Sequence, residues 1–155
     1  MGAIKIRDAR LSDARIIAGF NVRMAMETES RPLDPDLINP GVAAVLRDAS
    51  KGRYWVAEAD GQVVGQLMVT YEWSDWRNGV FWWIQSVYVR EDSRRSGVFS
   101  ALHRHVESLA RQTSDVCGLR LYVERANHRA RKTYLAIGMA SPGYEVMEID
   151  FRKGQ

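Results

Sequence analysis

Three strand-like runs follow one another between residues 53 and 89, separated only by short turns. Arg53–Ala59 is followed by Asp60-Gly61, a dipeptide typical of two-residue hairpin turns, and then by the long run Gln62–Trp73. The stretch SDWRNG turns the chain again, and Val80–Val89 forms the third run. Strands joined by such short turns pair antiparallel, so a three-stranded meander is expected at the centre of the fold.

The segment before this meander predicts one strand and two helices. Ala3–Arg7 alternates as a short strand, and Ser12 is expected to cap a helix that runs to about Glu27. Apolar side chains recur in that helix at helical spacing, which indicates its core face. The proline-bearing stretch RPLDPDLINPG predicts an irregular connection with one helical turn, and Val42–Arg47 predicts a second helix.

The segment after the meander alternates between helix and strand. One apolar helical face is predicted from Phe99 to Ala110, followed by a strand at Leu119–Glu124 and a helix at Asn127–Ile137. Gly138 is expected to end that helix. A last strand is predicted at Tyr144–Phe151.

The element order β-α-α-β-β-β-α-β-α-β predicts the α/β (α+β) class. A mixed, mostly antiparallel central sheet flanked by helices is expected, with a parallel crossover from the third run of the meander to the next strand. The length of 155 residues and the 46% hydrophobic fraction indicate a single domain over residues 1–155.

Composition disfavours several classes of protein. The formal net charge of +3 is too weak to favour a nucleic-acid-binding domain, although basic residues gather between Arg125 and Lys132. The single cysteine, Cys117, indicates a reducing compartment, and the chain has neither a secretory signal nor an apolar run of about 18 residues, so a cytoplasmic protein without a membrane span is expected. The three histidines lack metal-ligand spacing with Cys117, so no metal site is expected.

Two arginines and a glycine lie where a helix is about to begin, in the segment Arg94-Arg95-Ser96-Gly97-Val98-Phe99. A helix start leaves backbone N–H groups without partners, and glycine lets the backbone approach a ligand closely. Neither the P-loop pattern nor the three-glycine dinucleotide fingerprint is present. The segment predicts a phosphate site, with a solvated basic turn as the alternative.

A second pattern follows the next strand. Asn127 is placed to cap a helix, and Ala130 and Tyr134 share its face. Tyr134 would then point toward whatever the first segment binds, although a core aromatic is the alternative from spacing alone.

These two segments resemble the motifs of the GNAT superfamily of acyl-CoA-dependent N-acetyltransferases. The first resembles [QR]-x-x-G-x-[GA], with Phe99 standing where glycine or alanine is usual. The second meets N-x-x-A-x-x-x-Y-x-x-x-G fully, through Asn127, Ala130, Tyr134 and Gly138. The resemblance covers nearly the whole chain, because the element order matches as well.

The resemblance implies acetyl-CoA (coenzyme A) as co-substrate. The backbone of the first motif would hold its pyrophosphate, the pantetheine arm would lie along the preceding strand like an extra strand, and Asn127 would hydrogen-bond that arm. The strands Val80–Val89 and Leu119–Glu124 would have to splay apart to admit the thioester. The implied cofactor-binding residues are Ser86, Val87, Tyr88, Val89, Arg94, Arg95, Ser96, Gly97, Val98, Phe99, Ser100 and Asn127.

The implied reaction is direct attack of a primary amine on the acetyl thioester. Tyr134 would protonate the leaving thiolate, and the backbone N–H of Val87 or Tyr88 would polarise the carbonyl. The strand before the first motif has no carboxylate, which leaves the general base open. Glu27, Glu29 and Gln85 are the preferred contacts of the acceptor; for the carboxylates, a solvated surface position is the alternative.

Three functions compete at this point. The first is acetyl transfer to a small-molecule amine, with residues 31–40 as a lid, or to a protein N-terminus or lysine. The second is a non-catalytic acyl-CoA-binding module, and the third is a nucleic-acid-binding domain. Trp73, Trp76, Trp82 and Trp83 crowd one hairpin, so one of the adjacent pair is expected in the core and a homodimer is compatible with the rest. The sequence does not identify the acceptor.

Overall fold

A computed structural model describes residues 1–152 of the chain. The chain divides into two compact units, Met1–Tyr122 and Val123–Gln155, and each is described by itself. The first unit contains β1 (Lys5–Asp8), α1 (Ala14–Glu29), α2 (Pro35–Arg47), β2 (Arg53–Ala59), β3 (Gln62–Ser74), β4 (Gly79–Val89), α3 (Val98–Gln112) and β5 (Val116–Leu121). The second contains α4 (His128–Ala136).

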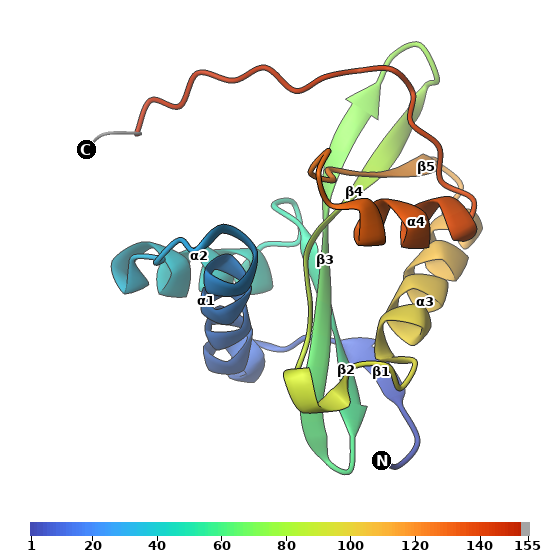
Figure 1. Cartoon of the computed structure of the whole chain (residues 1–155). Helices are drawn as coiled ribbons and strands as arrows, with labels where there is room; N and C mark the ends of the chain where they lie inside the picture. The colour runs from blue at the N-terminus through green and yellow to red at the C-terminus, as the bar shows by residue number, and fades with distance from the viewer. Residues whose placement is uncertain (153–155) are drawn as a thin grey trace. The chain divides into compact units, whose positions relative to one another are not determined.

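The five strands form one sheet in the order β1-β2-β3-β4-β5 (Figure 1). All neighbours are antiparallel except β4 and β5, which are parallel. Asp60 and Gly61, with φ of 53° and 75°, make the tight turn between β2 and β3. The predicted mixed sheet, with its central meander and parallel crossover, is therefore confirmed.

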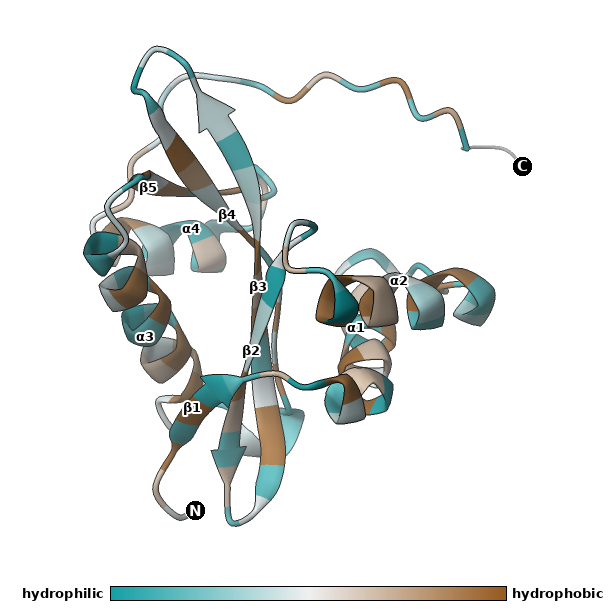
Figure 2. Ribbon diagram, turned by 180° about the vertical axis from the view of Figure 1, so that it is seen from behind, coloured by the Kyte–Doolittle hydropathy of each residue, from teal (hydrophilic) through white to brown (hydrophobic). Residues whose placement is uncertain are grey.

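Helices cover both faces of this sheet, α1 and α2 on one face and α3 on the other (Figure 1). Under α3, the buried side chains of Trp55, Leu67, Trp82 and Leu102 belong to one apolar core. Under α1 and α2, a smaller core is built around Ile17, Val42, Tyr54 and Val56. Figure 2 shows hydrophobic residues concentrated along the middle of the central strands.

The adjacent tryptophans of β4 point to opposite faces, as alternation requires. Trp82 is buried, with its ring centroid 5.8 Å from that of Trp55. Trp83 is half-buried, and its ring centroid lies 4.4 Å from that of Tyr122. The expectation that one of the two belongs to the core is confirmed for Trp82.

A β-bulge interrupts the pairing of β3 with β4. Gln66 pairs with Tyr88 and Met68 with Gln85, so Ser86 and Val87 together lie opposite the single residue Leu67. Ser86 has a φ of 50°, in the left-handed region. The pairing of β4 with β5 ends nearby, at Ile84–Leu121.

Two predicted helix starts in the first unit were wrong. Asp13, not Ser12, precedes α1, and its carboxylate accepts the N–H of Arg10 (2.7 Å) and binds the Arg7 guanidinium (2.8 Å). The Arg7 contact is the main reason that the pKa of Asp13 is lowered. The helix α2 begins at Pro35, well before Val42, because Asp34 caps it through the N–H of Asp36 and a proline fits the first helical turn.

The predicted last strand was also wrong. β5 spans Val116–Leu121 rather than Leu119–Glu124, and residues 144–150 have no regular secondary structure. The side chains of Tyr144, Val146 and Ile149 are exposed. Alternation of apolar residues gives a segment one apolar face, but a strand also needs a neighbour to satisfy its backbone, and alternation does not supply one.

The second unit confirms the predicted helix with its cap. Asn127 Oδ1 accepts the N–H of Ala130 (3.1 Å), and Gly138, two residues beyond α4, has a φ of 95°. Such a left-handed glycine is the usual end of a helix. Within residues 1–152, no helix has the length and apolar character needed to span a membrane.

Candidate active site

The loop between β4 and α3 has the backbone expected of an anion site. Arg95 and Gly97 both adopt left-handed conformations, with φ of 63° and 88°. Gly97 is the N-cap of α3, and no side chain caps the helix. A Cβ at Gly97 would meet nothing within 4 Å, which leaves open space for a ligand at this backbone.

Arg94 joins this loop to the end of α1. Its Nη2 lies 2.7 Å from Glu27 Oε2, its Nε donates to the carbonyl of Val89 (2.9 Å), and its guanidinium lies 5.3 Å from the centroid of the Tyr88 ring. The Tyr88 hydroxyl donates to Glu27 Oε1 at 3.2 Å, and burial followed by the Glu27 charge raises the pKa of Tyr88. Two residues that the sequence assigned to different ligands, Glu27 and Arg94, are therefore paired with each other.

The second half of β4 has no partner in the β5 ladder. Because the pairing with β5 ends at Ile84, the residues Gln85–Val89 extend beyond the end of that ladder. A strand edge of this kind accepts an extended chain through backbone hydrogen bonds. The separation of the two strands that the resemblance implies stays a prediction, since β5 itself ends at Leu121.

A buried polar network on the α1 side of the sheet binds the backbone of the bulge. Gln66 Nε2 donates to the Ser86 carbonyl and to Asn21 Oδ1, both at 3.1 Å, and Asn21 Nδ2 donates to the Tyr54 hydroxyl, also at 3.1 Å. Asn21, Tyr54 and Gln66 are all buried. Burial raises the pKa of Tyr54, so its side chain is a neutral phenol at physiological pH.

A pocket of about 480 Å³ adjoins this network, between α1, α2 and the central strands. Its polar end contains Asn21, Tyr54 and Ser86, and Thr28 and Glu29 contribute from the end of α1. Its apolar wall is made by Met24, Leu33, Ile38, Val42, Val45 and Met68.

The three predicted acceptor contacts lie in different surroundings. Glu29 lines the pocket, whereas the Glu27 carboxylate is bound by Arg94. Gln85 donates from its Nε2 to Thr70 Oγ1 on β3. Only Glu29 is therefore placed directly against the pocket.

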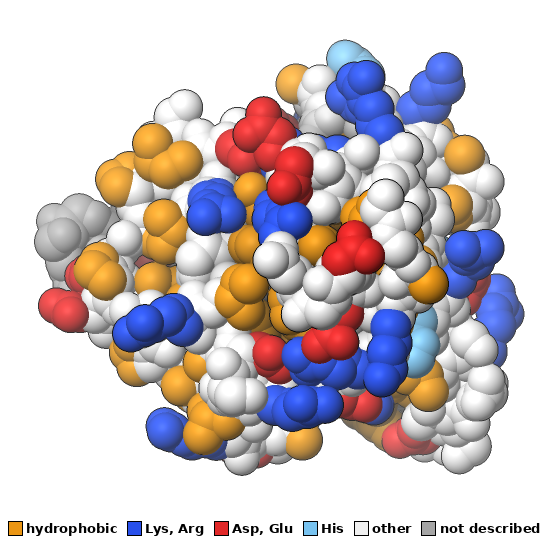
Figure 3. Space-filling view, turned by 90° about the horizontal axis from the view of Figure 1, so that it is seen from below, with side chains coloured by type: hydrophobic (Ala, Val, Ile, Leu, Met, Phe, Trp, Pro, Cys, Tyr) orange, Lys and Arg blue, Asp and Glu red, His pale blue; other side chains and the backbone are white. Residues whose placement is uncertain are grey.

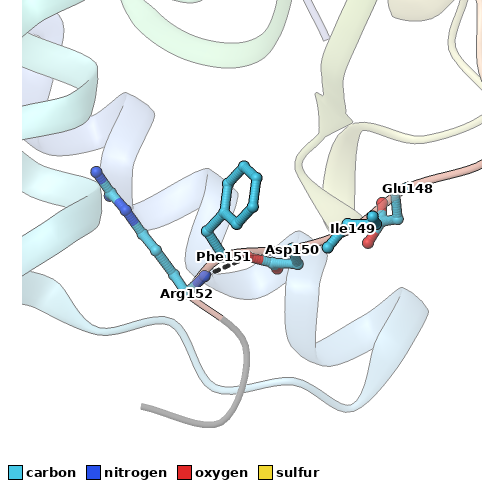
Figure 4. Close-up of a pocket in the computed structure, with 5 residues that line it drawn as sticks. All are labelled: Glu148, Ile149, Asp150, Phe151 and Arg152. Atoms are coloured by element: carbon cyan, nitrogen blue, oxygen red, sulfur yellow. Dashed lines mark hydrogen bonds between the residues drawn. The ribbon is translucent and has the colours of Figure 1, made fainter.

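A second pocket, of about 360 Å³, contains none of the predicted site residues. It is lined by the consecutive residues 148–152, and the one hydrogen bond drawn in Figure 4 runs from the Arg152 N–H to Asp150 Oδ1. No residue distant in the sequence lines it.

Asn127 and Tyr134 lie in the second unit, at the start and toward the end of α4. The Oδ1 atom of Asn127 is used as the helix cap, which leaves its amide NH₂ as the donor group. Tyr134 is half-buried, and burial raises the pKa of its phenol, which keeps it protonated at physiological pH.

The sequence did not reveal Asn21, Tyr54 and Gln66. A signal was present, since Asn21 follows Phe20 directly in an apolar helical stripe and Gln66 interrupts the strand VVGQLMV. A polar side chain within an apolar run is buried only when it is hydrogen-bonded, so such a residue indicates a network.

Basic side chains do not gather into one surface on the face shown in Figure 3, where lysines and arginines lie among aspartates and glutamates. A continuous basic footprint is what a nucleic-acid-binding domain presents.

Comparison with known proteins identifies the family. Residues 21–139 match the model of the acetyltransferase (GNAT) family, and none of the curated proteins compared with the chain matches it. The structure of a "possible acetyltransferase" from Clostridium difficile 630 is similar to this one, with a TM-score of 0.90 and 45% identity over 95% of this chain and 97% of that one.

Two more distant structures share the fold. A ribosomal-protein-alanine N-acetyltransferase from Brucella melitensis biovar Abortus 2308 has a TM-score of 0.76 and 23% identity, over 96% of this chain and 99% of that one. A "predicted acetyltransferase with acetyl-CoA" from Clostridium acetobutylicum has a TM-score of 0.78 and 17% identity, over 96% of each chain. The chain therefore belongs to the GNAT family of acetyltransferases, enzymes for which acetyl-CoA is the co-substrate.

Proposed function

We propose that this protein transfers an acetyl group from acetyl-CoA to a primary amine of a small molecule, by direct attack of the amine on the thioester. The observation that carries the proposal is that the polar end of the 480 Å³ pocket reaches Ser86, in the bulge where β4 extends past its pairing with β5. A donor lying along the edge of β4 and an acceptor in this pocket would meet at the bulge.

The donor side of this proposal uses backbone groups. The N–H groups of Arg95, Gly97, Phe99 and Ser100 would hold the diphosphate, as the left-handed Gly97 and the uncapped start of α3 favour. The segment Ser86–Val89 would pair with the pantetheine arm. Only the backbone is needed at Phe99, and its ring packs 6.0 Å from the ring of His103, one turn further along α3.

In the reaction, the amine nitrogen forms a C–N bond to the acetyl carbon while the C–S bond breaks and the nitrogen loses a proton. The backbone N–H of Val87 or Tyr88 would polarise the carbonyl. Tyr134 would protonate the departing thiolate, which needs a neutral phenol, and burial raises the pKa of Tyr134 in the required direction. Asn127 would bind the pantetheine arm through its NH₂ group.

Glu29 is the preferred contact for the amine, because it is the acidic residue that lines the pocket. Glu27 is a weaker candidate, since Arg94 and Tyr88 both bind its carboxylate. Gln85 would act through an ordered water.

The substitution Tyr134→Phe tests the acid. We expect kcat to fall roughly 10²-fold or more, the usual contribution of a positioned general acid, with little change in acetyl-CoA affinity. Thiol release measures the first quantity and calorimetry the second. Tyr144→Phe, the same change at an exposed position of the second unit, is the control. Unchanged turnover in Tyr134→Phe would show that the acid is assigned wrongly.

A homodimer is part of the proposal and rests on the exposed aromatic residues at the end of the β3–β4 hairpin. The side chains of Trp73 and Trp76 are 59% and 89% exposed. Exposed apolar groups of this size often mark an interface. Light scattering should give the mass of two chains, and the double substitution Trp73→Ser and Trp76→Ser should give the mass of one. A single-chain mass for the unaltered protein would contradict it. A cytoplasmic location is also proposed, on the basis of the single cysteine.

A further inference from the structure

The pocket between α1, α2 and the sheet has an uneven distribution of polarity. One end is polar, with Asn21, Tyr54 and Ser86, and the wall contributed by α2 is apolar, with Ile38, Val42 and Val45. These three residues recur at intervals of four and three, which places them on one face of the helix. The pocket therefore offers polar contacts at one end and an apolar surface along its length.

The charge of the lining limits which amines fit. Glu29 is the single carboxylate among the pocket-lining residues, none of which is Lys, Arg, His or Asp, and all of which lie within the described part of the chain. One carboxylate matches one ammonium group. A polyamine or an aminoglycoside carries several positive charges, and burying the others without partners would cost free energy.

We propose, on the basis of the proposed acetyl transfer, that the acceptor is a monoamine with an extended apolar group, which lies against the α2 wall while its nitrogen points toward Ser86. The pocket volume of about 480 Å³ is within the range of small-molecule sites and admits an alkyl or phenylalkyl group. Glu29 lies at the end of α1, about 12 Å further along the helix than Asn21, so its charge attracts the ammonium form to the pocket, while the nitrogen that reacts lies at the polar end with Ser86.

A homologous series of amines tests this assignment. For propylamine, butylamine, pentylamine and hexylamine, kcat/KM should rise about threefold to fourfold with each added methylene until the apolar wall is covered, because each methylene leaves water. Spermidine and ethanolamine should be poor acceptors. A series without dependence on length, or a preference for spermidine, would overturn the assignment.

The substitution Val45→Phe provides a test within the protein. Val45 is half-buried in the wall, and a larger side chain there shortens the space available to the apolar group. We expect a decrease of tenfold or more in the affinity for hexylamine, measured by calorimetry, and in kcat/KM. The matched control is Val22→Phe, an exposed valine of α1 that does not line the pocket. Equal effects of the two substitutions would contradict the assignment.

Acetyl-CoA binding and a screen of other amines distinguish failure of the acceptor assignment from failure of the proposed acetyl transfer. If acetyl-CoA binds and polyamines or peptides are acetylated in preference to hexylamine, the acceptor assignment is wrong and the acetyl transfer stands. If no amine of any class is acetylated, both are wrong. Acetyl-CoA affinity should be the same in the unaltered protein and in Val45→Phe, because Val45 lies on α2 and is not among the proposed cofactor-binding residues; denaturant unfolding checks that the variant stays folded, since Val45 also packs against the smaller core.

Discussion

His103 is a buried histidine on the core face of α3, 4% exposed. Its Nδ1 has no hydrogen-bond partner within residues 1–152, and its Nε2 lies 3.7 Å from Glu107. Burial lowers the pKa of His103, while the Glu107 charge opposes this shift. The folded protein therefore prefers the neutral imidazole.

This preference predicts a pH dependence of stability. Because the pKa of His103 in the folded state lies below its value of about 6.5 in the unfolded chain, the unfolded state binds more protons below pH 6.5. The contribution of His103 to the free energy of unfolding should be nearly constant well above pH 6.5. As the pH falls below 6.5, the free energy of unfolding should decrease, by at most about 1.4 kcal/mol per pH unit. Urea unfolding at several pH values measures this slope.

The substitution His103→Leu should remove that component of the slope, and His128→Gln, at an exposed histidine, should leave it in place. An identical pH profile in His103→Leu and the unaltered protein would exclude His103 as its source.

Single residues show what the sequence alone could and could not predict. Asn127 and Gly138 were predictable because a cap and a helix end depend on neighbours a few positions away. The pairing of Glu27 with Arg94 was not, since the two residues are 67 positions apart and only the folded sheet brings α1 to this loop.

At the scale of elements, α3 packs closely on β3 through Gly65. A Cβ at this position would lie 2.8 Å from Val98 Cγ1 and 3.2 Å from the Tyr88 carbonyl oxygen. Both neighbours belong to the region where α3 begins and β4 ends, so the glycine fixes how closely the proposed diphosphate loop approaches the sheet.

The substitution Gly65→Ala should lower the free energy of unfolding by about 1–3 kcal/mol, the usual cost of inserting a methyl group into a packed core. Gly19→Ala is the matched control. A Cβ at Gly19 meets nothing within 4 Å, and alanine is favoured over glycine inside a helix, so this variant should gain about 1 kcal/mol. Denaturant unfolding of both variants tests the contrast, and a loss of stability in neither would contradict it.

Elements were predictable where local chemistry decides them. Asp60-Gly61 and the alternating runs on either side determine the β2–β3 hairpin without help from the rest of the chain. The predicted start of α2 was wrong because Asp34 and Pro35 begin a helix that continues through Pro40, whereas closely spaced prolines are typical of an irregular connection. The prediction of a last strand at Tyr144–Phe151 was wrong for a different reason, because alternation of apolar residues does not provide a strand with a pairing partner.

At the scale of the whole molecule, the second unit is too small to be stable by itself. Its helix α4 has nine residues and none of them is buried, and an isolated helix of that length is not stable in water. The family match from residue 21 to residue 139 includes parts of both units, and the single domain stays a prediction.

We therefore predict a single cooperative thermal transition for the whole chain. In scanning calorimetry the calorimetric and van't Hoff enthalpies should agree, and acetyl-CoA at about 100 times its Kd should stabilise the folded state by about 2.7 kcal/mol. A separate transition at lower temperature, with loss of helix signal, would show that the second unit unfolds independently.

The proposed acceptor pocket could not be predicted from the sequence. Its lining residues come from α1, α2, the segment between them and three strands, so no local pattern identifies them as a group. The proposed diphosphate loop could be predicted from the sequence because its residues, Arg94–Ser100, are adjacent in the chain.

The bulge at Ser86–Val87 adds one residue to β4, so the residues that face the core under α3 change from even-numbered to odd-numbered positions. Ahead of it, Trp82 and Ile84 belong to the core beneath α3; beyond it, Val87 and Val89 pack there instead. Tyr88 is thereby turned to the other layer, with its ring centroid 5.0 Å from that of Phe20 of α1. Deleting one residue at this point would exchange inside and outside for every later side chain of the strand. The bulge is where we propose that donor and acceptor meet. It also places Tyr88, whose hydroxyl binds Glu27, on the α1 side of the sheet.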